Sequence, residues 1–201
     1  MLKKACKLLA ASDKHLKTIY EKYGAPPLWD RPAGFGTLLH IILEQQVSLA
    51  SAKACFDKLC FALGELTPEN LLTLDDAELR SVGFSRQKTL YARHLAESVV
   101  GKRIDLDDLA NLSDADVKSE LLKLKGVGEW TSDIYLLMAM LRPDVMPKGD
   151  LALHIAWQKL TEAERKPGSD EFIQMAVKWS PYRSVAARLL WHFYLSERRK
   201  Q

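Results

Sequence analysis

The segment 121–132, Leu-Leu-Lys-Leu-Lys-Gly-Val-Gly-Glu-Trp-Thr-Ser, has the residue types and spacing best suited to binding an anion. Gly126 and Gly128 are separated by one valine, so the backbone can turn sharply with positive φ while the valine anchors the turn in the core. The next helix would then present its first unpaired N–H groups, at Gly128 and Glu129, with the positive end of its dipole. Lys125 adds a charge beside them. The pattern predicts a phosphate site made largely by main chain.

Such a turn is typical of a helix–hairpin–helix motif, which binds a DNA phosphate without reading bases. A simple corner between two helices with a glycine C-cap would explain the Gly-Val-Gly spacing equally well. The fuller pattern favours the hairpin, because Leu-x-Gly-Val-Gly-x-Trp-Thr is followed by a helical stretch, a loop and an isolated Asp.

That isolated carboxylate is Asp150, which follows a loop containing Pro143, Pro147 and Gly149. Its position predicts the N-cap of a helix, a role that Asp fills well. A functional carboxylate is the alternative, and the two roles are compatible. His154 lies four residues later on the same helical face and is a candidate neighbour.

The cysteines and histidines offer no metal site. Cys6, Cys55 and Cys60 are an odd number with no CxxC spacing, which argues against a four-cysteine zinc site or a cysteine-ligated iron–sulfur cluster. The five histidines are scattered. Free thiols in a reducing compartment are therefore expected.

The composition is that of an ordinary globular protein, with 201 residues, 47% hydrophobic and 27% charged. It excludes a disordered chain, a collagen-like repeat and a disulfide-dense scaffold. The net charge of +3 permits a polyanionic partner without requiring one. No apolar run approaches the length of a membrane span, so a soluble intracellular protein is expected.

The hydrophobic spacing predicts helices nearly throughout and no convincing strand, hence an all-α class. The expected helices are 2–23 ended by Gly24, 35–43, 48–63, one starting at Thr67-Pro68, 75–82, 86–100, 117–124, 129–141, 150–160 and 181–198.

At this point the chain resembles the helix–hairpin–helix (HhH-GPD) superfamily of DNA base-excision glycosylases, and within it the 3-methyladenine DNA glycosylase II (AlkA-like) group. The resemblance rests on four segments in the family's order, namely 35–48 from Phe-Gly-Thr-Leu-Leu to Gln-Gln-Val-Ser, the hairpin at 124–132, Pro-Lys-Gly-Asp at 147–150, and 179–191 from Trp-Ser-Pro-Tyr-Arg-Ser to Leu-Trp.

The resemblance implies two helical lobes with a cleft between them. One lobe would be 34–140, containing the hairpin at about 117–141, and the other would combine 1–33 with 141–201. The N-terminal β-rich domain of larger bacterial members has no room here, so a compact form is expected.

By the resemblance, Asp150 is the catalytic carboxylate. Breaking an N-glycosidic bond develops oxocarbenium character on the sugar, which a desolvated anion stabilises. The same group could activate the attacking water. Bifunctional relatives carry a lysine just after the hairpin, where this chain has Trp130. A monofunctional glycosylase without lyase activity is therefore expected, and it would need no iron–sulfur cluster.

The resemblance also assigns the base pocket and the gap-filling residue. Trp130 and Trp191 would hold a cationic methylated base, since Trp faces attract cations. Ile134 and Leu151 stand where larger relatives have tyrosines. Gln46 would fill the gap left by the flipped nucleotide.

The remaining implied contacts are with the DNA backbone and with an ion. The implied DNA-binding residues are Lys125, Gly126, Gly128, Thr131 and Arg183. For Arg183 there is a second interpretation, a structural role in which its hydrogen bonds tie the last helix to the cleft. A structural Na⁺ or K⁺ would bind the carbonyls of Leu122, Leu124 and Val127.

The expected function is excision of alkylated purines, 3-methyladenine and also 7-methylguanine, from double-stranded DNA by a monomer. The cytoplasm with its nucleoid, or the nucleus in a eukaryote, would be its location. Two alternatives stay open. The protein could bind damaged or abasic DNA without catalysis, or it could excise another lesion such as hypoxanthine.

Overall fold

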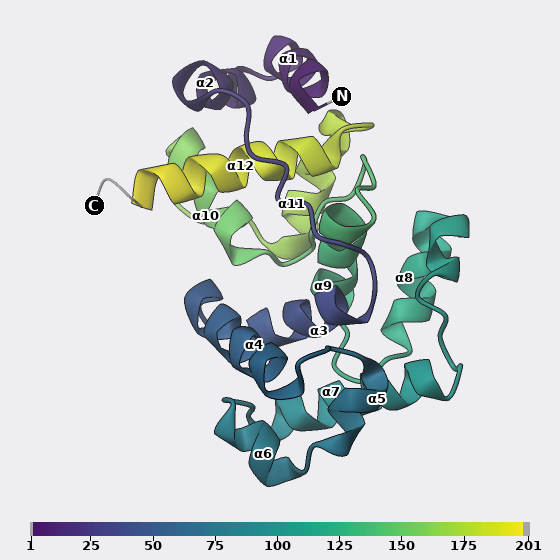
Figure 1. The fold of residues 1–201 in the computed structure, drawn as a ribbon. Coiled ribbons are helices and arrows are strands. Elements are labelled where there is room, and N and C mark those ends of the chain that lie inside the picture. The colour runs from purple at the N-terminus through teal and green to yellow at the C-terminus, as the bar shows by residue number, and fades with distance from the viewer. Residues whose placement is uncertain (1, 199–201) are drawn as a thin grey trace. The chain divides into compact units, whose positions relative to one another are not determined.

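The computed structural model describes residues 2–198, and the chain divides into two compact units (Figure 1). Unit 1 combines Met1–Asp30 with Leu141–Gln201, and unit 2 is Arg31–Met140. The sequence placed the first boundary slightly later, between 33 and 34. The all-α class is confirmed, because residues 2–198 form helices and no strand. Over the same residues, no helix has both the length and the apolar character that crossing a membrane requires.

Unit 1 is built around its last helix. Its elements are α1 (Leu2–Ser12), α2 (Lys14–Tyr23), α10 (Leu151–Thr161), α11 (Ser169–Ala176), a 3₁₀ turn (Val177–Trp179) and α12 (Arg183–Arg198). Helix α12 packs against α1, α2 and α10. Its Ala186, Leu189 and Leu190 are fully buried, so this helix carries the core of the unit.

Unit 2 surrounds a helix that is apolar on nearly every side. Its elements are α3 (Phe35–Glu44), α4 (Leu49–Leu63), α5 (Pro68–Thr73), α6 (Asp76–Ser81), α7 (Arg86–Val100), a 3₁₀ turn (Asp108–Asn111), α8 (Asp114–Leu122), α9 (Glu129–Ile134) and a π-helical segment (Tyr135–Ala139). Helix α3 packs against α4, α7 and α9. Because its run from Leu38 to Leu43 is buried almost all round, α3 occupies the centre of the unit.

The expected single helix over 2–23 is wrong, since two helices meet at Asp13. The backbone of Asp13 is extended, with φ −135° and ψ 116°, and its carboxylate accepts hydrogen bonds from the N–H groups of His15 and Leu16. These two bonds cap α2, and they end the continuity that the hydrophobic spacing had suggested.

The three further differences are one missed helix and two helix boundaries. The sequence missed α11, although Gly168 followed by Glu171 at the third helical position is a start signal that the structure uses. The helix expected over 129–141 is α-helical only to Ile134 and then π-helical to Ala139. The last helix begins at Arg183, because Tyr182 N–H still closes a turn onto the Trp179 carbonyl.

The hairpin between α8 and α9 requires glycine at one position. Gly126 has φ +85°, and a Cβ there would lie 2.2 Å from the ring of Tyr91 on α7. The aromatic ring therefore packs directly on the backbone, which only a residue without a side chain permits.

We expect Gly126→Ala to lower the free energy of unfolding by about 2–4 kcal/mol, combining left-handed strain with overpacking against Tyr91. Gly64→Ala is the matched control, since Gly64 also has positive φ (+71°) but nothing lies within 4 Å of its added Cβ. The control should cost about 1 kcal/mol. Urea unfolding of both variants measures the difference, and equal losses would contradict the packing argument.

Candidate functional site

Asp150 is a buried carboxylate at the start of α10. It is 7% exposed, and its Oδ1 accepts hydrogen bonds from Leu153 N–H at 3.0 Å and from the indole Nε1–H of Trp191 at 3.2 Å. Gly149, directly before it, has φ +76° and turns the chain into the helix. The predicted N-cap is therefore present, and the cap is also the candidate catalytic group.

Trp191 on α12 joins that carboxylate to a second indole. Its ring lies 6.4 Å from the ring of Trp29, at an interplanar angle of 78°. Trp29 has φ +50°, a left-handed conformation that is uncommon for a bulky residue. An edge-to-face pair of indoles thus accompanies the hydrogen bond to Asp150.

The loop that leads to Asp150 is fastened to the start of α12. The guanidinium of Arg183 donates to both carboxylate oxygens of Asp144, at 2.9 and 3.0 Å. Ser184 Oγ accepts from Val145 N–H at 2.9 Å and donates to the Arg142 carbonyl at 2.6 Å. Arg183 is therefore engaged within unit 1, as the structural interpretation of this residue expected, and its phosphate contact stays a prediction.

His154 is buried beside Asp150 on the same helix. Its ring lies 4.9 Å from that of Phe172, and its Nε2 has no hydrogen-bond partner among residues 2–198. Burial lowers the pKa of His154, and the charge of Asp150 partly opposes that shift. His154 is therefore a buried neighbour of Asp150 on α10, packed against Phe172.

The hairpin in unit 2 opens α9 without a side-chain cap. Gly128 is the N-cap residue, is exposed, and cannot cap the helix through a side chain. Lys125 is exposed as well. Thr131, by contrast, is only 2% exposed, and its hydroxyl accepts a hydrogen bond from Gln45. The Thr131 hydroxyl is thus engaged within unit 2, and the contact of Thr131 with DNA stays a prediction.

Three side chains from other helices support the hairpin. Gln45, at the end of α3, donates to the Gly126 carbonyl and to Thr131 Oγ1, both at 2.8 Å. His94 Nδ1 accepts the N–H of Lys125 at 3.1 Å. The third is the Tyr91 ring that covers Gly126. No role was predicted for these three residues from the sequence. The spacing of Tyr91 and His94 on α7 was the available signal, because residues three apart share a face.

The residues predicted for the base pocket differ in accessibility. Leu151 is 59% exposed and Trp130 is half-buried, whereas Ile134 is 2% and Trp191 is 8% exposed. Gln46 is exposed with φ +58°. Their roles toward a base or a gap stay predictions.

The expected cation site consists of main-chain carbonyls at the hairpin. Of these, the Leu124 carbonyl accepts the N–H of Val127 at 3.1 Å. A carbonyl oxygen has a second lone pair, so this bond is compatible with an ion. Leu122 is exposed and Val127 is buried. The monovalent ion stays a prediction.

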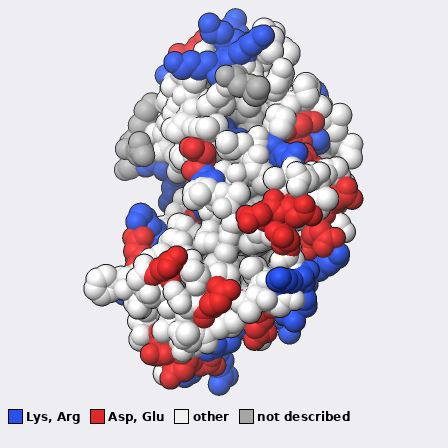
Figure 2. Space-filling view, turned by 45° about the vertical axis from the view of Figure 1, so that its right-hand side comes forward, with Lys and Arg blue, Asp and Glu red and all other residues white. Residues whose placement is uncertain are grey.

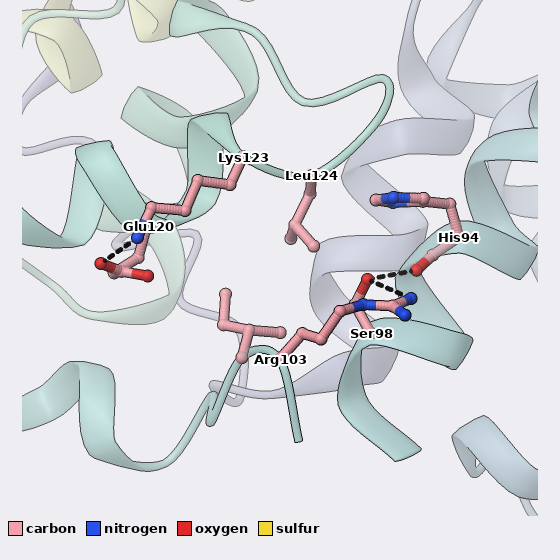
Figure 3. A pocket seen from close by; sticks show the side chains of 7 residues that line it. His94, Ser98, Arg103, Glu120, Lys123 and Leu124 are labelled. Atoms are coloured by element: carbon pink, nitrogen blue, oxygen red, sulfur yellow. Dashed lines mark hydrogen bonds and ion pairs between the residues drawn. The ribbon is translucent and has the colours of Figure 1, made fainter. Parts of the chain in front are cut away.

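A small pocket of about 200 Å³ lies behind the hairpin in unit 2 (Figure 3). Within it, Arg103 donates to Ser98 Oγ at 3.3 Å, and Lys123 pairs with Glu120. Leu124 is the only predicted site residue that lines it. Neither Asp150 nor any residue predicted for the base pocket lines it, so this pocket is not the candidate active site.

The surface charge is mixed. Figure 2 shows acidic and basic side chains interspersed over the face in view. No group of three or more His, Cys, Asp or Glu side chains in residues 2–198 could hold a metal ion. Binding of a polyanion would therefore depend on local main-chain donors as well as on single cations.

The family model described as the HhH-GPD superfamily base excision DNA repair protein matches residues 39–181. The chain belongs to the HhH-GPD superfamily. This confirms the resemblance found in the sequence.

Two curated relatives match this chain over most of its length. YfjP of Bacillus subtilis is 28% identical over 90% of this chain and 66% of its own length. Alkylbase DNA glycosidase-like protein mag2 of Schizosaccharomyces pombe is 27% identical over 99% of this chain and 97% of its own.

Two solved HhH-GPD structures share both fold and sequence with this chain. The 3-methyladenine DNA glycosylase Mag1 of S. pombe, solved with abasic DNA, has a TM-score of 0.87 and 26% identity over 94% of this chain and 95% of its own. A DNA-3-methyladenine glycosidase of Bacillus halodurans has a TM-score of 0.79 and 29% identity over 98% and 91%.

We expect the Asp144–Arg183 pair to stabilise the protein only above acidic pH. Burial opposes ionisation of Asp144, but hydrogen bonds from Arg183 and Ser180 outweigh it and lower the pKa of Asp144 below its ordinary value. A lowered pKa means that the contribution is complete above the unfolded value and is lost as pH falls through the folded one. Asp144→Asn should therefore cost about 1 kcal/mol at pH 7.

Urea unfolding of the wild type and of Asp144→Asn between pH 7 and pH 2.5 measures this contribution. The difference between them should be constant down to about pH 5 and should shrink below the ordinary Asp value of about 3.9. A difference that persists undiminished at pH 2.5 would contradict the assignment.

Proposed function

We propose that this HhH-GPD protein is a monofunctional DNA glycosylase that hydrolyses the N-glycosidic bond of alkylated purines in duplex DNA. Its substrates are 3-methyladenine and, by the same chemistry, 7-methylguanine. The observation that carries the proposal is the buried Asp150 carboxylate, held by Trp191 and by the first turn of α10. The names of Mag1 and the B. halodurans enzyme support this substrate class.

The reaction breaks the bond between C1′ of the sugar and the purine nitrogen. The electron pair of that bond moves into an N-alkylated purine that already carries a positive charge, so the base leaves neutral and no general acid is needed. The sugar becomes oxocarbenium-like, and Asp150 stabilises that charge from a desolvated position. Water attacks C1′ and gives up a proton, for which Asp150 is the base. The products are the free base and an abasic site.

Selection of the base uses the aromatic residues. A cationic purine is attracted to indole faces, and Trp130 and Trp191 supply them. Ile134 and Leu151 add apolar surface without further rings. We place these four residues at the flipped base.

The hairpin binds the DNA backbone in this proposal. The main chain at Gly126 and Gly128 binds a backbone phosphate, and Lys125 adds a charge. Gln46 occupies the gap that the flipped nucleotide leaves. The protein acts as a monomer on chromosomal DNA, in the nucleoid or in the nucleus of a eukaryotic source.

We expect Asp150→Asn to lower release of 3-methyladenine by at least about 100-fold, because the amide carries no charge to stabilise the oxocarbenium ion. Affinity for a duplex with an abasic-site analogue should stay within a few-fold. Chromatography of bases released from methylated genomic DNA, with binding by fluorescence anisotropy, measures both. Asp170→Asn, the same change at a carboxylate with 89% exposure in unit 1, is the control.

Full activity of Asp150→Asn would end the catalytic assignment. If the wild type released no base at all, non-catalytic binding of damaged DNA would be the function. Release of hypoxanthine alone would instead point to a different lesion.

We also expect no lyase activity, because Trp130 cannot form a Schiff base at the position where bifunctional relatives have lysine. Incubation with abasic DNA and borohydride should trap no covalent adduct, while a bifunctional glycosylase run in parallel should be trapped. A trapped band for this protein would refute the hydrolytic mechanism.

A further inference from the structure

Gln45 makes an unusual pair of contacts for a residue at a helix end. Its side-chain Nε2 lies 2.8 Å from the Gly126 carbonyl oxygen and 2.8 Å from Thr131 Oγ1. Gly126 is the glycine of the hairpin turn, and Thr131 lies in the first turns of α9. One amide group at the C-cap of α3 thus binds both the turn of the hairpin and the helix that follows it.

The orientation of this amide follows from its partners. A backbone carbonyl only accepts hydrogen bonds, so the atom of Gln45 that faces Gly126 must be the nitrogen. Both protons of the NH₂ group are then used. A carboxylate at this position could not donate to the Gly126 carbonyl, and an apolar side chain could make neither bond.

The same residue fixes the loop that contains Gln46. The N–H of Gln45 closes the last turn of α3 onto the Ile42 carbonyl, and Lys88 on α7 donates to the carbonyl of Leu43. Gln46 follows at once in a left-handed conformation, with φ +58°, and is exposed. A left-handed conformation is unfavourable for a residue other than glycine, so it persists only where the surrounding structure enforces it.

We propose that Gln45 is a positioning residue that fixes the spacing between the phosphate-binding hairpin and the Gln46 loop. This inference rests on the proposed function, since it assigns the hairpin to a phosphate and Gln46 to the gap left by a flipped nucleotide. With the hairpin bound to a phosphate, the two bonds of Gln45 set where Gln46 meets the base stack. Recognition of a gap then depends on a residue that itself contacts no DNA.

The proposal predicts two different ways in which a substitution can lower affinity for DNA. A change that only weakens the hairpin lowers affinity for intact and for abasic duplex by the same factor. A change that frees the Gln46 loop from the hairpin removes the extra affinity for the gap, so the ratio of the two affinities falls.

The test is Gln45→Met, which removes both donors and keeps the length of the side chain. Fluorescence anisotropy gives the Kd for a duplex with a tetrahydrofuran abasic analogue and for the same duplex undamaged. The preference for the abasic duplex should fall about tenfold, the factor expected when a pair of modest hydrogen bonds is lost. Adding Gln46→Ala to Gln45→Met should lower that preference no further.

Gln158→Met is the matched control. The amide of Gln158 also donates to two oxygens, the carbonyls of Ala163 and Glu164, but in unit 1 at the end of α10. It should leave the preference unchanged. Thr131→Val removes one of the two acceptors with little change in shape, and an intermediate loss of preference is expected even if Gln45→Met folds poorly.

Equal losses on both duplexes in Gln45→Met and in Thr131→Val would overturn the proposal, as would a wild type with no preference for the abasic duplex. The assay contains no reaction step. Failure of the glycosylase proposal would show instead as wild-type protein that prefers the abasic duplex but releases no base.

Discussion

The burial of one carboxylate constrains much of unit 1. A carboxylate that is 7% exposed must receive hydrogen bonds, and Asp150 receives them from the first turn of α10 and from Trp191. These donors come from two helices, so α10 and α12 must keep a fixed position relative to each other. The Asp144–Arg183 pair and the Ser184 hydroxyl fasten the loop that leads into α10 to the start of α12. The carboxylate is thereby oriented before any substrate arrives, which is what electrostatic stabilisation of a transition state requires.

Side chains from α7 and from the end of α3 contact the backbone of the hairpin and constrain its conformation. Gly126 has the Tyr91 ring on one side and the Gln45 amide on its carbonyl, while His94 accepts the N–H of Lys125. Several of its polar main-chain groups are thus already bound within unit 2. This explains how a chain with a net charge of only +3 can be suited to DNA, since donors fixed on a rigid turn need few lysines around them.

The sequence predicted those features that depend on local spacing. The glycine pair, the Asp150 cap and the helical class follow from rules that act over a few residues, and the order of segments was enough to identify the family. It failed where two local signals competed, as at Asp13, whose capping bonds overrode a continuous hydrophobic stripe. It also could not show that Gln45 lies against Gly126, because contacts between residues 81 apart depend on how α3 packs.

The two functional segments use the same feature of helix ends in opposite ways. Gly126 and Gly149 both adopt positive φ shortly before a helix starts. At α10 the N-terminal donors are met by an anion of the protein itself, Asp150. At α9 the N-cap is Gly128, which has no side chain to meet them. An internal anion would block a phosphate, whereas a glycine admits one. The choice of a single N-cap residue thus separates the helix start that holds the proposed catalytic group from one suited to holding a ligand.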